Sequence, residues 1–184
     1  MKNWIKESVK WNLIGIISLI LVIIFIILSE QHKLDKNNSN NLKHLDSIEV
    51  LNLKDSVLNF IYDMRLEHPY IVYAQAVLES NDFTSNIFKE NNNCFGMKVA
   101  TVRQSTNKGS QYDHAVFDNW KDCIIDYALY QARYLSNIKT EEQYFTYLEQ
   151  SYAEDPNYIQ KLKSIIHNKK LREIFDLYET QTTN

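Results

Sequence analysis

Residues that form tight turns are scarce in this chain of 184 residues, which contains three glycines and two prolines. A β-sandwich or β-barrel needs such a turn at most of its connections, so the shortage argues against both architectures. Two cysteines are too few for a disulfide framework or a four-cysteine zinc site, and the five histidines form no metal-binding motif. Lysine and arginine number 20 against 23 acidic residues, so the chain lacks the positive excess that binding to a phosphate backbone requires. We therefore expect no metal, no cofactor and no nucleic-acid partner.

Apolar residues are concentrated near the N-terminus, where residues 13–28 carry no charge. As a helix with a rise of about 1.5 Å per residue this run is about 24 Å long, and its neighbours extend it toward the ~30 Å hydrocarbon core of a bilayer. Trp4 and Trp11 lie where interfacial aromatic residues are common. The run is longer than the apolar core of a typical cleaved signal peptide, and no small-residue cleavage pattern follows it. We expect an uncleaved transmembrane signal anchor over residues 11–29.

Charged residues on either side of this run predict its orientation. Residues 1–10 contain three lysines, whereas Lys33 and Lys36 follow the run closely. This small excess predicts a cytoplasmic N-terminal segment, and it places residues 45–184 outside the cytoplasm in a single-pass protein of the cytoplasmic membrane. Residues 30–44 are polar and rich in asparagine, so they bury little apolar surface and are expected to form a flexible linker.

Helical patterns follow the linker. Apolar residues at helical spacing predict a helix over 53–64, and Pro69 is suited to the first turn of the next one. Residues 71–78 are apolar on nearly every face, which predicts a helix buried in the core.

The middle of the chain has a different pattern. Residues 95–102 and 111–117 are short segments with β-branched and aromatic side chains, separated by a polar stretch at 105–110. This arrangement predicts a β-hairpin.

Further helices are predicted by capping signals. Asn119 is a typical N-cap, Thr140 with Gln143 forms a capping-box pattern, and Asp155-Pro156 is suited to a cap and a first helical residue. A last helix is expected at about 170–178. The predicted fold class is therefore α+β and mostly helical, with a small β-hairpin lobe, preceded by one transmembrane helix.

Glu79 is the strongest candidate for chemistry because it ends the apolar segment 71–78. A carboxylate in such surroundings has a large desolvation cost unless it is paired or protonated. Burial raises a carboxyl pKa, and a raised pKa allows a glutamate to act as a general acid near neutral pH. The pattern alone leaves open a solvated glutamate at a helix end.

Three sequence blocks extend this interpretation: AQAVLES at 74–80, NCFGMK at 93–98 and YAEDPNY at 152–158. Together, in this order and roughly this spacing, they resemble the bacterial glucosaminidase family over about residues 50–170. These are peptidoglycan hydrolases and endo-β-N-acetylglucosaminidase-like domains with a lysozyme-like fold. The resemblance implies that residues 45–184 form a lysozyme-like catalytic domain.

The resemblance also implies roles for individual residues. Glu79 matches the catalytic acid of the family, and Phe95 and Gly96 match a segment that lines the substrate cleft. Tyr152 and Tyr158 match the two tyrosines of the third block. We expect Tyr152 to contact the acetamido group of the sugar in the active site and Tyr158 to bind substrate, with core packing as the alternative for Tyr158.

A second catalytic carboxylate is harder to assign. Some relatives carry a second glutamate in the hairpin lobe, but here no glutamate occurs between Glu90 and Glu141. Asp113, within the second expected strand, is the candidate. Without a second carboxylate, either a remotely held water would attack with inversion or the acetamido oxygen of the substrate would participate.

The implied function is that of a membrane-anchored glycoside hydrolase. It would cleave the β-1,4 bond on the reducing side of N-acetylglucosamine in peptidoglycan, with glycan strands and the membrane as its partners. The alternatives are a muramidase or lytic transglycosylase on the same scaffold, and a non-catalytic protein that binds cell-wall glycan. The oligomeric state and the redox state of Cys94 and Cys123 stay open.

Overall fold

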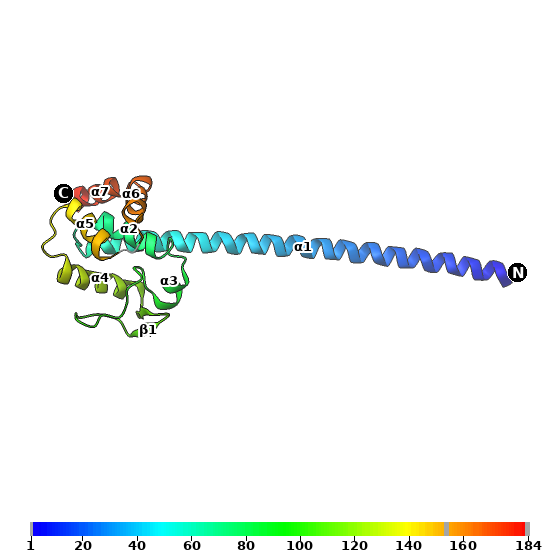
Figure 1. Ribbon diagram of the computed structural model, residues 1–184. Coiled ribbons are helices and arrows are strands. Elements are labelled where there is room, and N and C mark those ends of the chain that lie inside the picture. The colour runs from blue at the N-terminus through cyan, green and yellow to red at the C-terminus, as the bar shows by residue number, and fades with distance from the viewer. Residues whose placement is uncertain (1, 153–154, 183–184) are drawn as a thin grey trace. The chain divides into compact units, whose positions relative to one another are not determined.

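The computed structural model describes the backbone of residues 2–152 and 155–182, and the side chains from residue 24 onward within residues 24–152 and 155–180. The chain divides into two units, Met1–Val50 and Leu51–Asn184 (Figure 1). The second unit contains the buried core and all of the candidate site residues.

Helix α1 extends over Lys2–Asp63 and includes residues 30–44, which the sequence analysis expected to be a flexible linker. The correction has a simple physical reason. Glycine and proline are the residues that most disfavour a helix interior, and neither occurs between Gly15 and Pro69. The side chains of residues 30–44 are exposed, so the segment is helical without contributing to a core.

The expected transmembrane helix over residues 11–29 is wrong. Where the structure describes side chains, no helix is both long enough and apolar enough to cross a membrane. Of the expected span, residues 24–29 lie among those side chains. The remainder of the expected span, and the expected cytoplasmic segment 1–10, lie outside the residues whose side chains are described.

The second unit is mostly helical, as predicted. Helix α2 packs against α6 and α7, and α6 packs against α5 and α7 (Figure 1). Because α2 has a buried residue at every position from Ile71 to Val77, the prediction of a core helix is confirmed. The bounds of these helices are α2 Pro69–Glu79, α3 Asn86–Asn91, α4 Trp120–Tyr134, α5 Glu141–Ser151, α6 Tyr158–Asn168 and α7 Leu171–Thr182.

A two-stranded antiparallel sheet forms the small lobe, but from shorter strands than expected. Strand β1 (Gly109–Gln111) pairs with β2 (His114–Val116), with Ser110 opposite Ala115. The turn between them consists of Tyr112 and Asp113, whose φ angles of 53° and 59° suit a two-residue hairpin.

Residues 95–102, expected to be the first strand, form no ladder. They meet β2 through one backbone bond, in which the Ala115 N–H donates to the Met97 carbonyl at 2.8 Å. The sequence analysis missed the turn because Tyr-Asp lacks the glycine that usually accompanies positive φ angles. The expected strand therefore becomes an irregular segment, which leaves it available to line a cleft.

Most of the predicted helix starts are confirmed. The Asn119 side chain accepts two backbone N–H bonds at the start of α4, and Thr140 with Gln143 forms a reciprocal capping box at the start of α5. Pro69 is in the first turn of α2.

The predicted start of α6 is wrong by two residues. The helix begins at Tyr158, with Asn157 as N-cap, and the Asp155 carboxylate accepts the Asn157 N–H at 2.8 Å. Asp155 also pairs with Lys161 at 2.6 Å, so its charge is satisfied ahead of the helix. Helix α7 ends at Thr182, beyond the expected end at 178.

Candidate active site

A cleft of about 770 Å³ opens in the second unit at the C-terminal end of α2. One wall is the irregular segment 95–103, and the opposite wall consists of tyrosines from α4, α5 and α6. The volume falls in the range typical of small-molecule sites. The tyrosines that line the cleft are Tyr130, Tyr134, Tyr147, Tyr152 and Tyr158.

Glu79, the last residue of α2, lies half-buried in this cleft. Burial raises the pKa of its carboxyl group, against the opposing effects of a hydrogen bond from Tyr158 and of the His114 charge. Its position at a helix C-terminus, which carries partial negative charge, disfavours the carboxylate further. The carboxyl group is therefore suited to keep its proton at pH values above those at which glutamate normally ionises, and to donate that proton to a substrate.

The two oxygens of Glu79 have different surroundings. Oε1 accepts the Tyr158 hydroxyl at 2.8 Å. Oε2 lies 3.7 Å from the point that a Cβ atom on Gly96 would occupy. Gly96 has a φ angle of +61°, which an L side chain rarely adopts. Glycine at this position therefore leaves one oxygen of the acid unobstructed.

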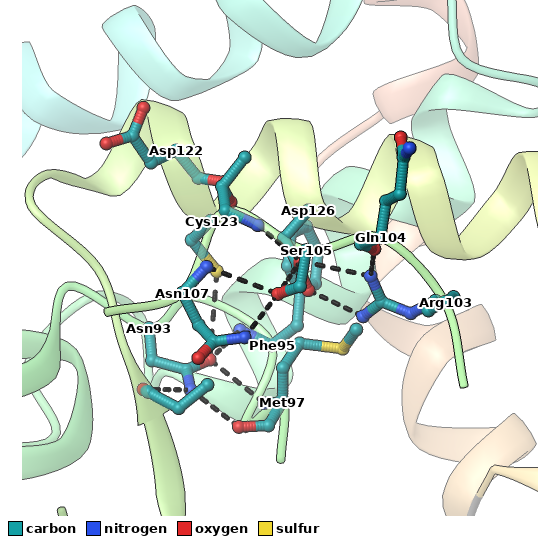
Figure 2. A network of polar contacts seen from close by, with 12 residues as sticks. Asn93, Phe95, Met97, Arg103, Gln104, Ser105, Asn107, Asp122, Cys123 and Asp126 are labelled. Carbon is teal, nitrogen blue, oxygen red and sulfur yellow. Dashed lines mark hydrogen bonds and ion pairs between the residues drawn. The ribbon is translucent and has the colours of Figure 1, made fainter. Parts of the chain in front are cut away.

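Asn93 shapes the turn that carries Gly96. Its buried side chain accepts the N–H of Met97 at 2.9 Å, and it donates to the carbonyls of Met97 and Ala115, both at 2.9 Å (Figure 2). One side chain thus closes the turn on itself and ties it to β2. The Phe95 ring, only 1 % exposed, stacks on Tyr127 with ring centroids 4.3 Å apart. The ring of Phe95 is therefore directed into the core. Its expected contact with the substrate stays a prediction.

The two tyrosines of the third sequence block both reach the site. Tyr152 is the C-cap of α5, and its hydroxyl donates to the Phe95 carbonyl at 2.8 Å. Burial raises its pKa, so the phenol stays neutral. Tyr158 is 7 % exposed and belongs to the core, which favours the packing alternative for its ring, while its hydroxyl contacts Glu79.

Asp113 is not brought to the cleft. It lies in the exposed hairpin turn, where it pairs with Lys98 at 3.0 Å, and this lysine lowers the pKa of the Asp113 carboxyl. Among the described cleft residues, Asp155 is the carboxylate other than Glu79. Lys161 and the Asn157 N–H lower its pKa as well.

The sequence analysis missed a buried ion pair that supports the cleft wall. Asp126, on the inner face of α4, binds two nitrogens of the Arg103 guanidinium at 3.0 and 2.6 Å (Figure 2). The same carboxylate accepts the Ser105 hydroxyl and the Thr106 N–H. The available signal was an aspartate at a helix position whose neighbours on the same face are apolar.

Cys94 and Cys123 are both fully buried, and both are free thiols. The Cys94 N–H donates to the Cys123 sulfur at 3.1 Å. Burial raises the pKa of the Cys94 thiol well above its ordinary value, so this thiol is a weak nucleophile. Within the residues whose side chains are described, no group of three or more histidine, cysteine, aspartate or glutamate side chains could hold a metal ion.

A carboxyl group with a raised pKa in an aromatic cleft is typical of the general acid of a glycoside hydrolase. The family model of the glucosaminidases, described as mannosyl-glycoprotein endo-beta-N-acetylglucosaminidase, matches residues 65–171. The chain belongs to this glucosaminidase family, and the resemblance inferred from the three sequence blocks is confirmed.

Two solved structures are similar to the chain. The crystal structure of the catalytic domain of the autolysin Auto from Listeria monocytogenes has 23 % identity and a TM-score of 0.49, over 67 % of this chain and 86 % of that one. An N-acetylmuramoyl-L-alanine amidase from Staphylococcus aureus has 25 % identity and a TM-score of 0.49, over 66 % of this chain and 41 % of that one. No curated protein significantly matches the chain.

Proposed function

We propose that this protein is a peptidoglycan hydrolase of the endo-β-N-acetylglucosaminidase type. It cleaves the β-1,4 bond on the reducing side of N-acetylglucosamine, with Glu79 as the general acid. The observation that carries the proposal is the raised pKa of Glu79 in an aromatic cleft, within a chain of the glucosaminidase family. Because cell-wall glycan lies outside the cytoplasm, we also propose an extracytoplasmic location for the second unit.

The chemistry assigned to Glu79 is proton donation to the glycosidic oxygen. Oε1 is held by Tyr158, and Oε2, on the side of Gly96, gives its proton to the departing sugar. The cleft tyrosines present apolar ring faces to sugar rings, and their hydroxyls supply polar contacts. Tyr152 stays a neutral phenol beside Glu79, suited to a hydrogen bond with the acetamido group.

The role of nucleophile is assigned to the substrate. As Glu79 protonates the departing oxygen, the acetamido oxygen of the same N-acetylglucosamine attacks its anomeric carbon, and water then opens the cyclic intermediate and returns a proton to Glu79. Asp113 is exposed and paired with Lys98, and Asp155 is paired with Lys161. Neither carboxylate is placed as a free nucleophile, and participation by the acetamido oxygen is an established exception to the scheme with two carboxylates. This route predicts retention of configuration at the cleaved carbon, which NMR of a fresh digest measures.

Product analysis tests the bond specificity. Digestion of purified peptidoglycan, followed by borohydride reduction and mass spectrometry, should give fragments that end in reduced N-acetylglucosamine. Reduced muramic acid ends would instead identify a muramidase, and anhydro-muramyl ends a lytic transglycosylase. Binding without released fragments would identify a non-catalytic glycan-binding protein.

Glu79→Gln tests the general acid. The substitution keeps the size and removes the proton that is donated, so we expect hydrolysis to fall by about 10²- to 10⁴-fold. The far-ultraviolet circular dichroism should not change. Glu149→Gln, at an exposed position of α5, is the matched control and should retain wild-type activity. Wild-type rates for Glu79→Gln would contradict the assignment.

A further inference from the structure

A buried series of hydrogen bonds leads away from Glu79 through the core. It consists of Tyr158, Gln75, Tyr127, Tyr144 and Gln131, and is called the polar relay here. These side chains come from α6, α2, α4 and α5, and none is more than 7 % exposed. Buried polar groups need partners, yet a mostly apolar core could have used apolar residues at all five positions. Packing alone therefore does not explain why these five positions are polar.

The direction in which each hydrogen bond of the relay donates is set at Gln131, the residue farthest from Glu79. The backbone N–H of Glu67 donates to Gln131 Oε1 at 2.9 Å, and Gln131 Nε2 donates to the Glu67 carbonyl at 3.0 Å. A backbone N–H can only donate and a carbonyl can only accept. These two bonds therefore fix which end of the Gln131 amide is oxygen and which is nitrogen.

The orientation of the Gln131 amide determines the direction of the hydrogen bonds made by Tyr144 and Tyr127. Gln131 Nε2 also donates to the Tyr144 hydroxyl oxygen at 3.2 Å. The Tyr127 hydroxyl donates its single hydrogen to Gln75 Oε1 at 2.6 Å. The bond of 2.9 Å between the two hydroxyls must then use the hydrogen of Tyr144. Every hydrogen between Gln131 and Gln75 thus points toward Gln75.

The last hydrogen bond of the relay is the one that Tyr158 donates to Glu79. Because Oε1 of Gln75 faces Tyr127, its Nε2 faces Tyr158 and donates to that hydroxyl at 3.3 Å. The single hydrogen of Tyr158 is then directed to Glu79 Oε1 at 2.8 Å. Oε1 is occupied as an acceptor, so a proton on Glu79 belongs on Oε2, the oxygen nearest Gly96.

We propose that the polar relay selects Oε2 as the oxygen from which Glu79 donates its proton, with Gln75, Tyr127, Tyr144 and Gln131 acting as positioning residues. The inference rests on the proposed function for its effect on hydrolysis. Its effect on Glu79 itself can be measured without substrate.

Other groups near Glu79 have partners outside the relay. The Tyr152 hydroxyl bonds to Phe95, His114 Nδ1 contacts the Tyr112 carbonyl, and Arg103 bonds to Asp126. A substitution in the relay therefore leaves the bonds of these groups in place. The charged and titratable groups that face Glu79 or line its cleft come from five parts of the second unit. They are His114 on β2, Lys98 and Arg103 on the wall segment, Tyr130 and Tyr134 on α4, Tyr147 and Tyr152 on and at the end of α5, and Asp155, Tyr158 and Lys161 at and before α6.

Tyr127→Phe tests the relay while preserving the stacked ring on Phe95. Without its donor, Gln75 Oε1 can turn toward Tyr158 and take the hydrogen that Glu79 Oε1 now receives. Because that hydrogen bond lowers the pKa of Glu79, its loss should raise the pKa. We expect an upward shift in a carbon-13 NMR titration of Glu79 in the full chain. The alkaline limb of kcat/KM should shift in the same direction, and kcat should fall about tenfold at unchanged KM.

Two variants calibrate the experiment. Tyr158→Phe removes the donor itself and gives the largest shift available. Tyr73→Phe is the matched control, because Tyr73 is a buried tyrosine of α2 whose hydroxyl bonds to the Lys54 carbonyl outside the relay. It should leave the Glu79 titration and the pH profile unchanged.

The outcomes separate the two proposals. A Glu79 pKa in Tyr127→Phe equal to that of the wild type would overturn the relay, whether or not peptidoglycan is cleaved. A wild type that releases no fragments would overturn the proposed function and leave the titration valid. Neutron diffraction of wild-type crystals below the Glu79 pKa needs no variant: deuterium on Oε2 supports the relay, and deuterium on Oε1 contradicts it.

Discussion

Glu79 and Gly96 form the centre of the candidate site. The carboxyl group ends an apolar helix, so burial raises its pKa, and the single hydrogen bond from Tyr158 does not fully offset that effect. Gly96 supplies a backbone conformation and an open space that an alanine would not. Both residues belong to blocks that identify the family, and the structure gives the physical reason for each.

The raised pKa of Glu79 predicts a dependence of stability on pH. A carboxyl whose pKa is higher in the folded than in the unfolded protein contributes most below the unfolded value of about 4.3. This contribution is lost as the pH rises through the folded value. Because glutamine does not titrate, Glu79→Gln should gain stability relative to the wild type between pH 4 and pH 8, as measured by urea unfolding. An equal difference at both pH values would show that the folded pKa is not raised.

Gly96→Ala is expected to reduce both stability and activity. The φ angle of +61° costs an L residue about 1–2 kcal/mol, and the new methyl group would lie 3.7 Å from Glu79 Oε2, where the substrate oxygen must approach. Gly109→Ala is the control, because Gly109 also has a positive φ angle but nothing within 4 Å of an added Cβ. Thermal unfolding and hydrolysis rates together should show a loss of activity only for Gly96→Ala.

At the scale of elements, the wall segment 95–103 decides the shape of the cleft. The sequence pattern suggested a strand, but the segment has one backbone bond to β2, and its far end is tied to α4 by Asp126. A segment without a ladder depends on side-chain anchors for its conformation. Asn93 anchors the beginning of the segment and Asp126 anchors its end (Figure 2).

Asp126→Asn should destabilise the second unit by about 3–5 kcal/mol, because it leaves the buried Arg103 guanidinium without its charge partner. Urea unfolding measures this loss, and a higher KM for glycan would show that the wall has moved. The matched control is Asp118→Asn, whose pair with Lys108 is more than half exposed on both sides and should change stability by less than about 1 kcal/mol. Equal effects for the two variants would contradict the anchor.

At the scale of the whole molecule, the chain separates into two units that differ in their buried apolar residues. Among the residues whose side chains are described, every buried apolar residue lies between Val57 and Phe175, within the second unit. The first unit is part of α1, and its described side chains are almost all exposed.

A chain that begins at residue 51 should therefore fold. Its core is intact, so we expect cooperative thermal unfolding with a midpoint close to that of the full chain. Hydrolysis of soluble glycan fragments should also be retained. Loss of cooperative unfolding would show that residues before 51 contribute to the core.

Local features could be predicted from the sequence because their causes are local. The caps at Asn119 and Thr140 need only the residues within one helical turn, and the core helix α2 needs only its uniform apolarity. The place of Glu79 at the end of that helix followed directly. The same local reasoning was wrong for the N-terminal run, where hydrophobicity alone suggested a membrane span.

The sequence by itself determined the family, the mostly helical composition and the candidate acid, because short motifs and periodicity encode these properties. Only the tertiary structure decided which groups surround that acid. Asp113 was excluded from the cleft, and Gln75, Tyr127 and Asp126 gained their roles, through contacts between residues 15 or more positions apart. Such contacts depend on how helices pack against one another, and no local pattern specifies that packing.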